Sequence, residues 1–227
     1  MMRIFALLAA LVIPCAATPA GLADFSNRDV VAALKEALTK SSDAAVSRLG
    51  IENGFFGDER VKILLPDSLK RAERVMSSIG MGRQADDLML RMNRAAEAAV
   101  PEARTLLVDA VRKMSIQDAK SVLTGGDDAA TQYFKRTTSG PLTQKFLPKV
   151  KDAMSRVRLA ETYDAFAERG RRLGLVKDAD ANLEDYITRK ALDGLFLVMA
   201  EEEKKIRQDP IGTASGIIKK VFGALRN

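Results

Sequence analysis

Apolar residues recur at helical spacing along most of this chain, and glycine or proline interrupts the pattern at short intervals. The stretch 30–49 shows it clearly, because apolar side chains fall every three or four residues and Gly50 follows directly. Such spacing places the apolar side chains on one face of a helix, and glycine just after it is a common helix end. Only 61–66 (VKILLP) has strand character, and six residues form one short strand at most. We therefore expect an all-α fold, a single-domain multi-helix bundle.

Start and stop signals divide the pattern into separate helices. A long helical stretch runs over 83–114, and Pro101 is expected to break or kink it because proline lacks a backbone N–H. Pro148 is expected to interrupt a later helix for the same reason. Between them, Asp127 or Asp128 is expected to begin a helix, since aspartate is a preferred N-terminal cap. The sequence contains no internal repeat and no long linker, which indicates one domain.

The N-terminus has the three-part layout of a secretory signal peptide. Arg3 supplies a positive start, residues 4–13 form an unbroken apolar run, and small residues follow. This run is too short to span a bilayer, which takes about 20 apolar residues. We interpret 1–23 as a signal peptide, with its cleavage point left open between residues 17 and 23. The remainder, 24–227, is then expected to be an exported, periplasmic helical domain without a transmembrane span.

The residue types that most enzymes and metal sites depend on are missing from the exported part. The chain has one cysteine, Cys15, which lies inside the expected leader, and it has no histidine and no tryptophan. A His-based triad, a Cys nucleophile and a zinc site of His or Cys therefore lack their residues. We expect no cofactor and no metal. Cys15 is a processing residue, and the alternative to a free periplasmic protein is a lipid anchor on it, because the residues before it loosely resemble a lipoprotein motif.

Positive charge is concentrated in one part of the sequence. The chain carries a formal net charge of +6, and 135–172 alone holds ten basic and four acidic residues. Such an excess favours anionic partners such as lipid headgroups. The basic residues are spread around their helices, however, which is typical of a solvated surface. Nucleic acid is not an expected partner, because the protein is exported and lacks aromatic residues interleaved with the basic ones.

Two places in the sequence are candidates for a polar site. Asp127 and Asp128 follow a glycine pair, where paired carboxylates can bind a hard cation, but the spacing is not that of an EF-hand and a helix cap is favoured. Asp193 lies in an expected helix from Leu183 to about Gln208 and has apolar neighbours on nearly every face, which predicts a desolvated carboxylate. Arg189, one turn earlier, is expected to neutralise it in a structural salt bridge.

The charged run 201–207 (EEEKKIR) is expected to pair within itself. Glu201 with Lys205, and Glu203 with Arg207, have the i,i+4 spacing of favourable ion pairs on a helix. The sequence therefore predicts a solvated helix surface here.

The last expected helix carries the clearest indication of a partner. It begins at Asp209-Pro210, its apolar residues form a stripe, and no acidic residue lies between Pro210 and Asn227. A basic amphipathic helix can lie on an anionic membrane, but the same pattern describes a helix that packs on its own domain, which we favour. The candidate membrane or partner face comprises Ile218, Lys219, Lys220, Val221, Phe222, Leu225 and Arg226.

Several longer strings resemble a known family. They are 93–97 (NRAAE), 127–134 (DDAATQYF) and two parts of 191–207, together with the segment 61–66. These strings resemble the uncharacterised bacterial family DUF4197, and the resemblance covers roughly 25–223. It implies a helical protein of the proteobacterial cell envelope, and it implies no activity, so no functional residue is carried over.

Two functions follow from these observations. We expect a non-catalytic binding or scaffold protein of the bacterial cell envelope that recognises a partner protein, an amphiphile or an anionic membrane surface. An interhelical cavity lined by Met, Leu and Phe would be its ligand site. The alternative is a carboxylate-dependent or metal-dependent hydrolase, which requires two acidic side chains in one concave pocket, at least one of them buried. Its candidate acids are Asp127, Asp128, Asp193 and Glu97.

Overall fold

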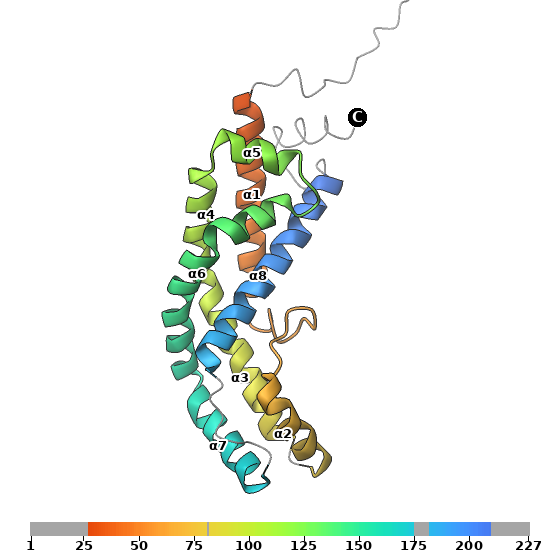
Figure 1. The fold of residues 1–227 in the computed structure, drawn as a ribbon, viewed down its shortest axis with the longest axis vertical. Helices are drawn as coiled ribbons and strands as arrows, with labels where there is room; N and C mark the ends of the chain where they lie inside the picture. The colour runs from red at the N-terminus through yellow and green to blue at the C-terminus, as the bar shows by residue number, and fades with distance from the viewer. Residues whose placement is uncertain (1–26, 81, 175–181, 210–227) are drawn as a thin grey trace, which may run out of the picture.

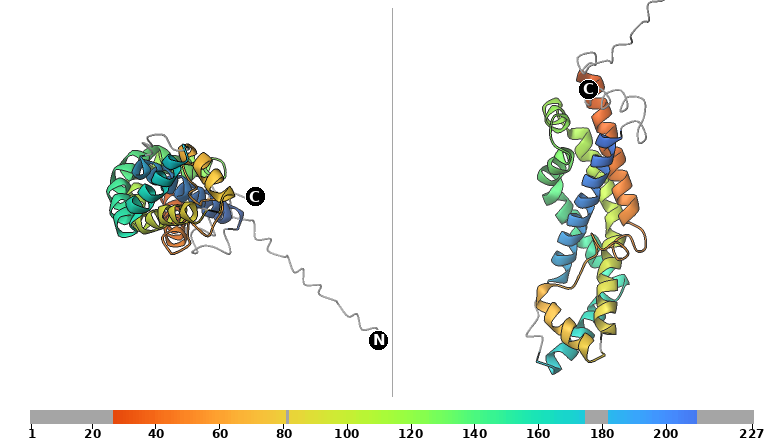
Figure 2. Two further views of the ribbon diagram at one scale, coloured as in Figure 1. Left: turned by 90° about the horizontal axis from the view of Figure 1, so that it is seen from below. Right: turned by 90° about the vertical axis from the view of Figure 1, so that its right-hand side faces the viewer.

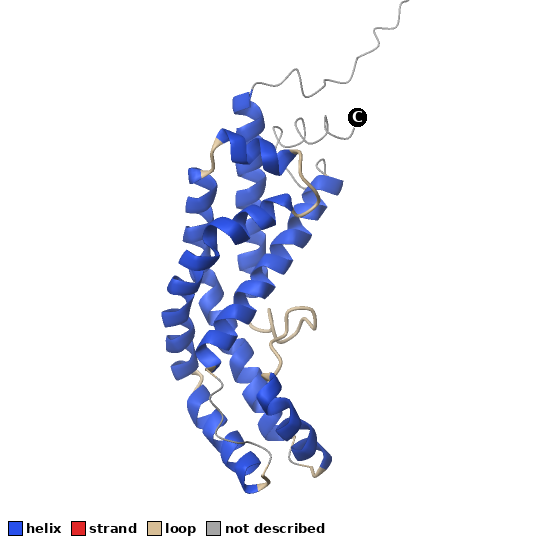
Figure 3. Cartoon of the chain, in the orientation of Figure 1, coloured by secondary structure: helices blue, strands red, loops and turns tan. Residues whose placement is uncertain are grey.

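The computed structural model describes residues 27–80, 82–174 and 182–209. Every regular element within these ranges is a helix and no strand occurs there (Figure 3), which confirms the all-α class. The expected signal peptide and the face from Ile218 to Arg226 lie outside the described residues and stay predictions. The helices are α1 (Asn27–Leu49), α2 (Asp67–Ser78), α3 (Arg83–Ala99), the short 3-10 helix η2 (Val100–Glu102), α4 (Ala103–Lys113), α5 (Ile116–Leu123), α6 (Ala129–Arg156), α7 (Leu159–Arg172) and α8 (Leu183–Gln208).

The helices form an elongated bundle with α8 in its middle (Figure 1). α8 packs against α6 on one side and against α1 on the other, and it also contacts α3. A view from the side shows the same arrangement, with α8 between α6 and α1 (Figure 2). α2 and α7 extend one end of the bundle, where each packs against α3.

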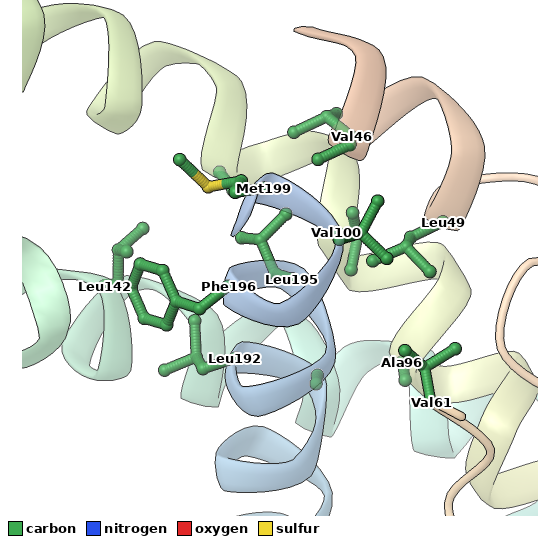
Figure 4. Close-up of a cluster of buried hydrophobic side chains, with 14 of the residues drawn as sticks. Val46, Leu49, Val61, Ala96, Val100, Leu142, Leu192, Leu195, Phe196 and Met199 are labelled. Carbon is green, nitrogen blue, oxygen red and sulfur yellow. The ribbon is translucent and has the colours of Figure 1, made fainter. Parts of the chain in front are cut away.

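The core is built from aliphatic and aromatic side chains that these helices direct toward one another. Figure 4 shows part of it, with side chains from α1, η2, α6 and α8 meeting around the middle of α8. Leu195 at this point is fully buried, so truncating it would cost about 2–5 kcal/mol. α3 packs closely against its neighbours because Ala95, Ala96 and Ala99 are all fully buried.

The prolines have different effects at their different positions. Pro101 lies in η2 and divides the 83–114 stretch into α3 and α4, as expected. The expected interruption at Pro148 is wrong, because α6 continues through both Pro141 and Pro148. Both rings are exposed, so water can reach the carbonyl groups that lose an N–H partner. The buried side chains of Leu142, Phe146 and Val150 hold the opposite face in the core, and α6 curves around the bundle (Figure 1).

The joint between α6 and α7 contains an unusual backbone conformation. Arg158 has φ 54° and ψ 40°, the left-handed region that side chains other than glycine, asparagine and aspartate rarely adopt. Arg91 of α3 donates a hydrogen bond from Nη1 to the carbonyl of Val157 and so holds the joint against α3.

Candidate functional site

A buried pair of polar residues on α3 holds residues 50–66, which join α1 to α2 and are called the joining segment below. Asn93 is fully buried, its Oδ1 accepts a hydrogen bond from the N–H of Ile63 at 2.8 Å, and its Nδ2 donates to the Ile63 carbonyl at 2.9 Å. The amide side chain thus occupies the place of a neighbouring strand. These two hydrogen bonds hold Ile63 against α3, although 61–66 forms no strand among the described residues.

Glu97, one turn further along α3, holds the start of the same segment. Its side chain is only 4% exposed, and Oε1 accepts hydrogen bonds from the N–H groups of Phe55 at 3.0 Å and Phe56 at 3.1 Å. Oε2 pairs with Nη1 of Arg94 at 2.6 Å, which compensates the buried charge. Asn93 and Glu97 are called the α3 anchor below. Because the carboxylate of Glu97 is fully engaged, it is not available as a catalytic acid.

The anchored segment lies directly against α8 at Gly194. A Cβ added to Gly194 would lie 2.7 Å from Cε1 of Phe55 and 3.3 Å from Cβ of Val61. Only glycine permits this close approach of α8 to the segment that joins α1 to α2.

A second buried carboxylate holds the start of α6. Glu203 of α8 accepts hydrogen bonds from the N–H of Ala130 at 2.9 Å and from the N–H of Thr131 at 3.0 Å. Arg207 pairs with Glu203 at 2.8 Å and donates to the Val122 carbonyl at the end of α5. The i,i+4 pair is confirmed, but the expectation of a solvated surface is wrong at Glu203, which satisfies the first N–H groups of a neighbouring helix.

Glu201 also has partners that the sequence did not indicate. Its Oε2 pairs with Arg48 of α1 at 3.2 Å and its Oε1 with Arg60 at 2.5 Å, whereas Lys205 pairs with Glu202. The expected pair between Glu201 and Lys205 is therefore wrong. Asp58 bonds to the same two arginines, and the hydrogen bonds from Arg60 and Arg48 hold the pKa of Asp58 well below its ordinary value.

A groove of about 530 Å³ runs along the outward side of α8 and is called the α8 groove below. The segment 60–64 and Lys70 form one wall, and residues from Asp128 to Lys135 at the start of α6 form the other. Figure 1 shows the joining segment and α6 on opposite sides of α8. The α8 side chains that line the groove include those of Tyr186, Lys190, Asp193, Phe196 and Leu197. The groove is open to solvent and has polar lining, unlike the expected interhelical cavity of Met, Leu and Phe.

The lining of the α8 groove is positive in sum. Five lysine or arginine side chains and two aspartates contribute to it. Lys62 pairs with Glu59 at 2.9 Å and Lys70 with Asp67 at 2.8 Å, but both carboxylates are highly exposed. Water screens such surface charges, so these pairs are weak and their cations remain available to a ligand.

Two further cations lie over aromatic rings of α8. The Nζ atom of Lys135 is 5.8 Å from the ring centroid of Phe196, and that of Lys190 is 6.0 Å from the centroid of Tyr186. These distances are at the outer limit of a cation–π interaction. Neither lysine forms a salt bridge within the described part of the chain, and both are exposed.

The position of Asp193 corrects the sequence-based expectation. Asp193 is exposed, Arg189 is also exposed, and the described residues include no salt bridge between them. The reason is geometric: Tyr186, Lys190, Asp193 and Leu197 recur every three or four residues and form the outward stripe of α8. The apolar neighbours of Asp193 on the other faces are buried, which made the whole helix look apolar.

The two aspartates before α6 have different surroundings. Asp128 is the N-cap position of α6, but its side chain makes no capping hydrogen bond and instead accepts one from Gln132 at 2.8 Å. Asp127 lies 3.9 Å from Lys204. Of the predicted polar-site residues, Asp128 and Asp193 therefore line the α8 groove together, and Asp127 and Arg189 do not. Within the described ranges, no group of three or more acidic, His or Cys side chains is arranged to hold a metal.

Comparison with known proteins gives a family. The family described as "Protein of unknown function (DUF4197)" matches residues 24–223, nearly the whole chain. The chain belongs to the DUF4197 family. No curated protein and no solved structure matches it. In the described part of this DUF4197 chain, no helix is both long and apolar enough to cross a membrane.

The strings that carry the family resemblance have structural roles in this DUF4197 chain. The string 93–97 contains the α3 anchor. The string 127–134 contains backbone N–H groups that donate hydrogen bonds to Glu203, which lies in 191–207. The groove cations Lys70, Lys135 and Lys190 were missed, because they are far apart in the sequence. The only local signal was the outward stripe of α8.

Proposed function

We propose that this DUF4197 chain is a non-catalytic binding protein of the bacterial cell envelope and that its ligand lies in the α8 groove. A periplasmic location is proposed from the signal peptide, with a lipid anchor on Cys15 as the alternative. The observation that carries the proposal is the groove itself. Its volume falls within the range of about 300–1,000 Å³ of small-molecule sites, and it combines apolar surface with converging polar groups.

The walls of the groove are held in place without a ligand. The α3 anchor fixes the joining segment through four backbone hydrogen bonds, and Glu203 fixes the start of α6 through two. A site whose walls are already ordered loses little conformational entropy on binding. This supports recognition of a ligand by a preformed surface.

The alternative, a carboxylate-dependent hydrolase, has weaker support. Asp128 and Asp193 do line one groove, as that function requires, but both are exposed to solvent. The desolvated carboxylate that such catalysis uses is not supplied by either residue. Glu97 is buried but engaged by the joining segment.

Native mass spectrometry of the protein isolated from an envelope extract tests the proposal. The wild-type chain is expected to retain a bound molecule, and the double variant Leu64→Gln/Leu197→Gln is expected to lose it. Leu64 and Leu197 line the groove and are 49% and 41% exposed. The matched control is Ile79→Gln/Leu173→Gln, at residues 54% and 44% exposed outside the groove, which should retain the molecule. The proposal would be contradicted if the wild-type protein carried no bound molecule, or if both double variants retained the molecule equally.

A further inference from the structure

We propose that the α8 groove binds an anionic amphiphile, with one phosphate or carboxylate headgroup between Lys70 and Lys190 and an apolar chain directed toward Leu197. The inference rests on the proposed function and adds the chemical class and the orientation of the ligand. It is carried by the arrangement of charge along the groove.

One end of the groove gathers positive charge. Lys70 of α2 and Lys190 of α8 both lie near Asp67, whose pKa is lowered by the hydrogen bond from Lys70 and by the charges of Lys70 and Lys190. Asp67 is almost fully exposed, so water screens its charge. Two ammonium groups therefore face one screened carboxylate, and a ligand anion can take the place of Asp67 beside them.

Tyr186 completes this end of the groove. Its hydroxyl donates a hydrogen bond to the Leu64 carbonyl at 3.0 Å, which ties α8 to the joining segment next to Lys190. Burial raises the pKa of Tyr186, so its hydroxyl stays protonated and neutral beside a bound anion. The headgroup position is thus bounded by two cations and a fixed aromatic ring.

The rest of the groove has apolar surface beside three further cations, Arg60, Lys62 and Lys135. Leu197 lies about 10 Å along the α8 axis from Lys190, at 1.5 Å per residue. Leu197 is 41% exposed although it is a leucine, and Phe196 and Ala200 line the groove beside it. An apolar chain that covers Leu197 removes this surface from water, which favours binding.

Asp193 limits where a ligand can carry charge. It lies between Lys190 and Leu197 on the outward stripe of α8, about one turn from each, and lines the groove. A second anionic group at the middle of the groove would meet this carboxylate. The headgroup of the ligand therefore lies beside Lys70 and Lys190 and not at the middle of the groove.

Calorimetric titration of the full chain with dodecyl phosphate, below its micelle-forming concentration, tests this inference. Dodecyl phosphate should bind, whereas inorganic phosphate and uncharged dodecyl maltoside should each bind at least about tenfold more weakly. Lys70→Gln and Lys190→Gln should each weaken dodecyl phosphate by about tenfold. The control Lys145→Gln, an exposed lysine of α6 outside the groove, should leave binding unchanged. Leu197→Gln should weaken dodecyl phosphate and leave inorganic phosphate unaffected.

Three results would overturn the inference. If dodecyl maltoside binds as tightly as dodecyl phosphate, the groove does not recognise the headgroup. If inorganic phosphate binds as tightly as dodecyl phosphate, the apolar chain of the ligand has no role. If Lys190→Gln binds dodecyl phosphate as tightly as Lys145→Gln does, the proposed headgroup position is wrong. Thermal unfolding of each variant verifies that it is folded. A molecule retained in the native mass spectrum that dodecyl phosphate fails to displace overturns the ligand class alone. If the isolated protein carries no bound molecule and also binds neither dodecyl phosphate nor the other compounds tested, the proposed function is overturned as well.

Discussion

Replacing Glu97 removes the contact that holds the joining segment at its start. In Glu97→Ala the N–H groups of Phe55 and Phe56 lose their acceptor, and an unsatisfied buried donor costs about 1–3 kcal/mol. Phe55 is fully buried and Phe56 is only partly buried, so the second donor recovers part of its loss from water. Arg94 is partly exposed and can be solvated once its partner is gone. We expect a loss of about 2–4 kcal/mol in the free energy of unfolding.

Glu97→Gln separates the hydrogen bonds from the charge. The amide oxygen can still accept from both N–H groups, but an NH₂ group now faces Arg94, so a loss of about 1–2 kcal/mol is expected. Urea denaturation with linear extrapolation measures both changes. The control is Glu102→Gln, which removes an exposed pair with Lys149 and should change stability by about 0.5 kcal/mol or less. If Glu97→Ala cost no more than this control, the role assigned to the α3 anchor would be refuted.

Four further results are expected. Gly194→Ala should destabilise the protein by about 1–3 kcal/mol in urea denaturation, because the new Cβ would lie 2.7 Å from an aromatic ring carbon. Arg158→Gly should raise the free energy of unfolding by about 0.5–1 kcal/mol, because glycine adopts φ 54° without strain; a lower midpoint of urea denaturation would contradict this. Asp58→Asn should destabilise the protein at pH 7, since the pKa of Asp58 is lowered in the folded state. This difference from the wild type should shrink as the pH falls below about 4, where the unfolded chain binds the proton, and a difference that grows instead would reverse the sign argued here. Intact-mass measurement of the protein isolated from cells should show cleavage between residues 17 and 23, and a lipid on Cys15 would favour the anchored alternative.

Helix positions could be predicted from the sequence because they depend on local spacing and on local end signals. The break at Pro101 was predicted correctly, since the α-helix gives way there to the 3-10 turn η2. The break predicted at Pro148 failed because the rule for proline takes no account of the core contacts of Leu142, Phe146 and Val150, which hold α6 on both sides of it. On an exposed face the lost hydrogen bond is replaced by water, and the core contacts of α6 outweigh it.

The site depended on contacts that no local pattern contains. Glu97 binds residues more than forty positions earlier, and Glu203 binds residues more than seventy positions earlier. The sequence predicted that Asp193 is buried because its neighbours in sequence are apolar. Its side chain instead belongs to the outward stripe of α8, whose members recur every three or four residues. Lys70 of α2 and Lys190 of α8 line the same groove only in the folded protein. Charge on one face of one helix could be predicted, but charge shared by three segments could not.

The contact of Glu203 with α6 also bears on the order in which the chain assembles. The first turn of α6 finds its acceptor on a residue 73 positions later, and Arg207 reaches the end of α5 across 85 positions. During synthesis from the N-terminus, the contacts of α8 with the end of α5 and the start of α6 cannot form before α8 has emerged. A fragment that ends before Glu203 would therefore leave the beginning of α6 frayed, even though every residue of α6 itself is present.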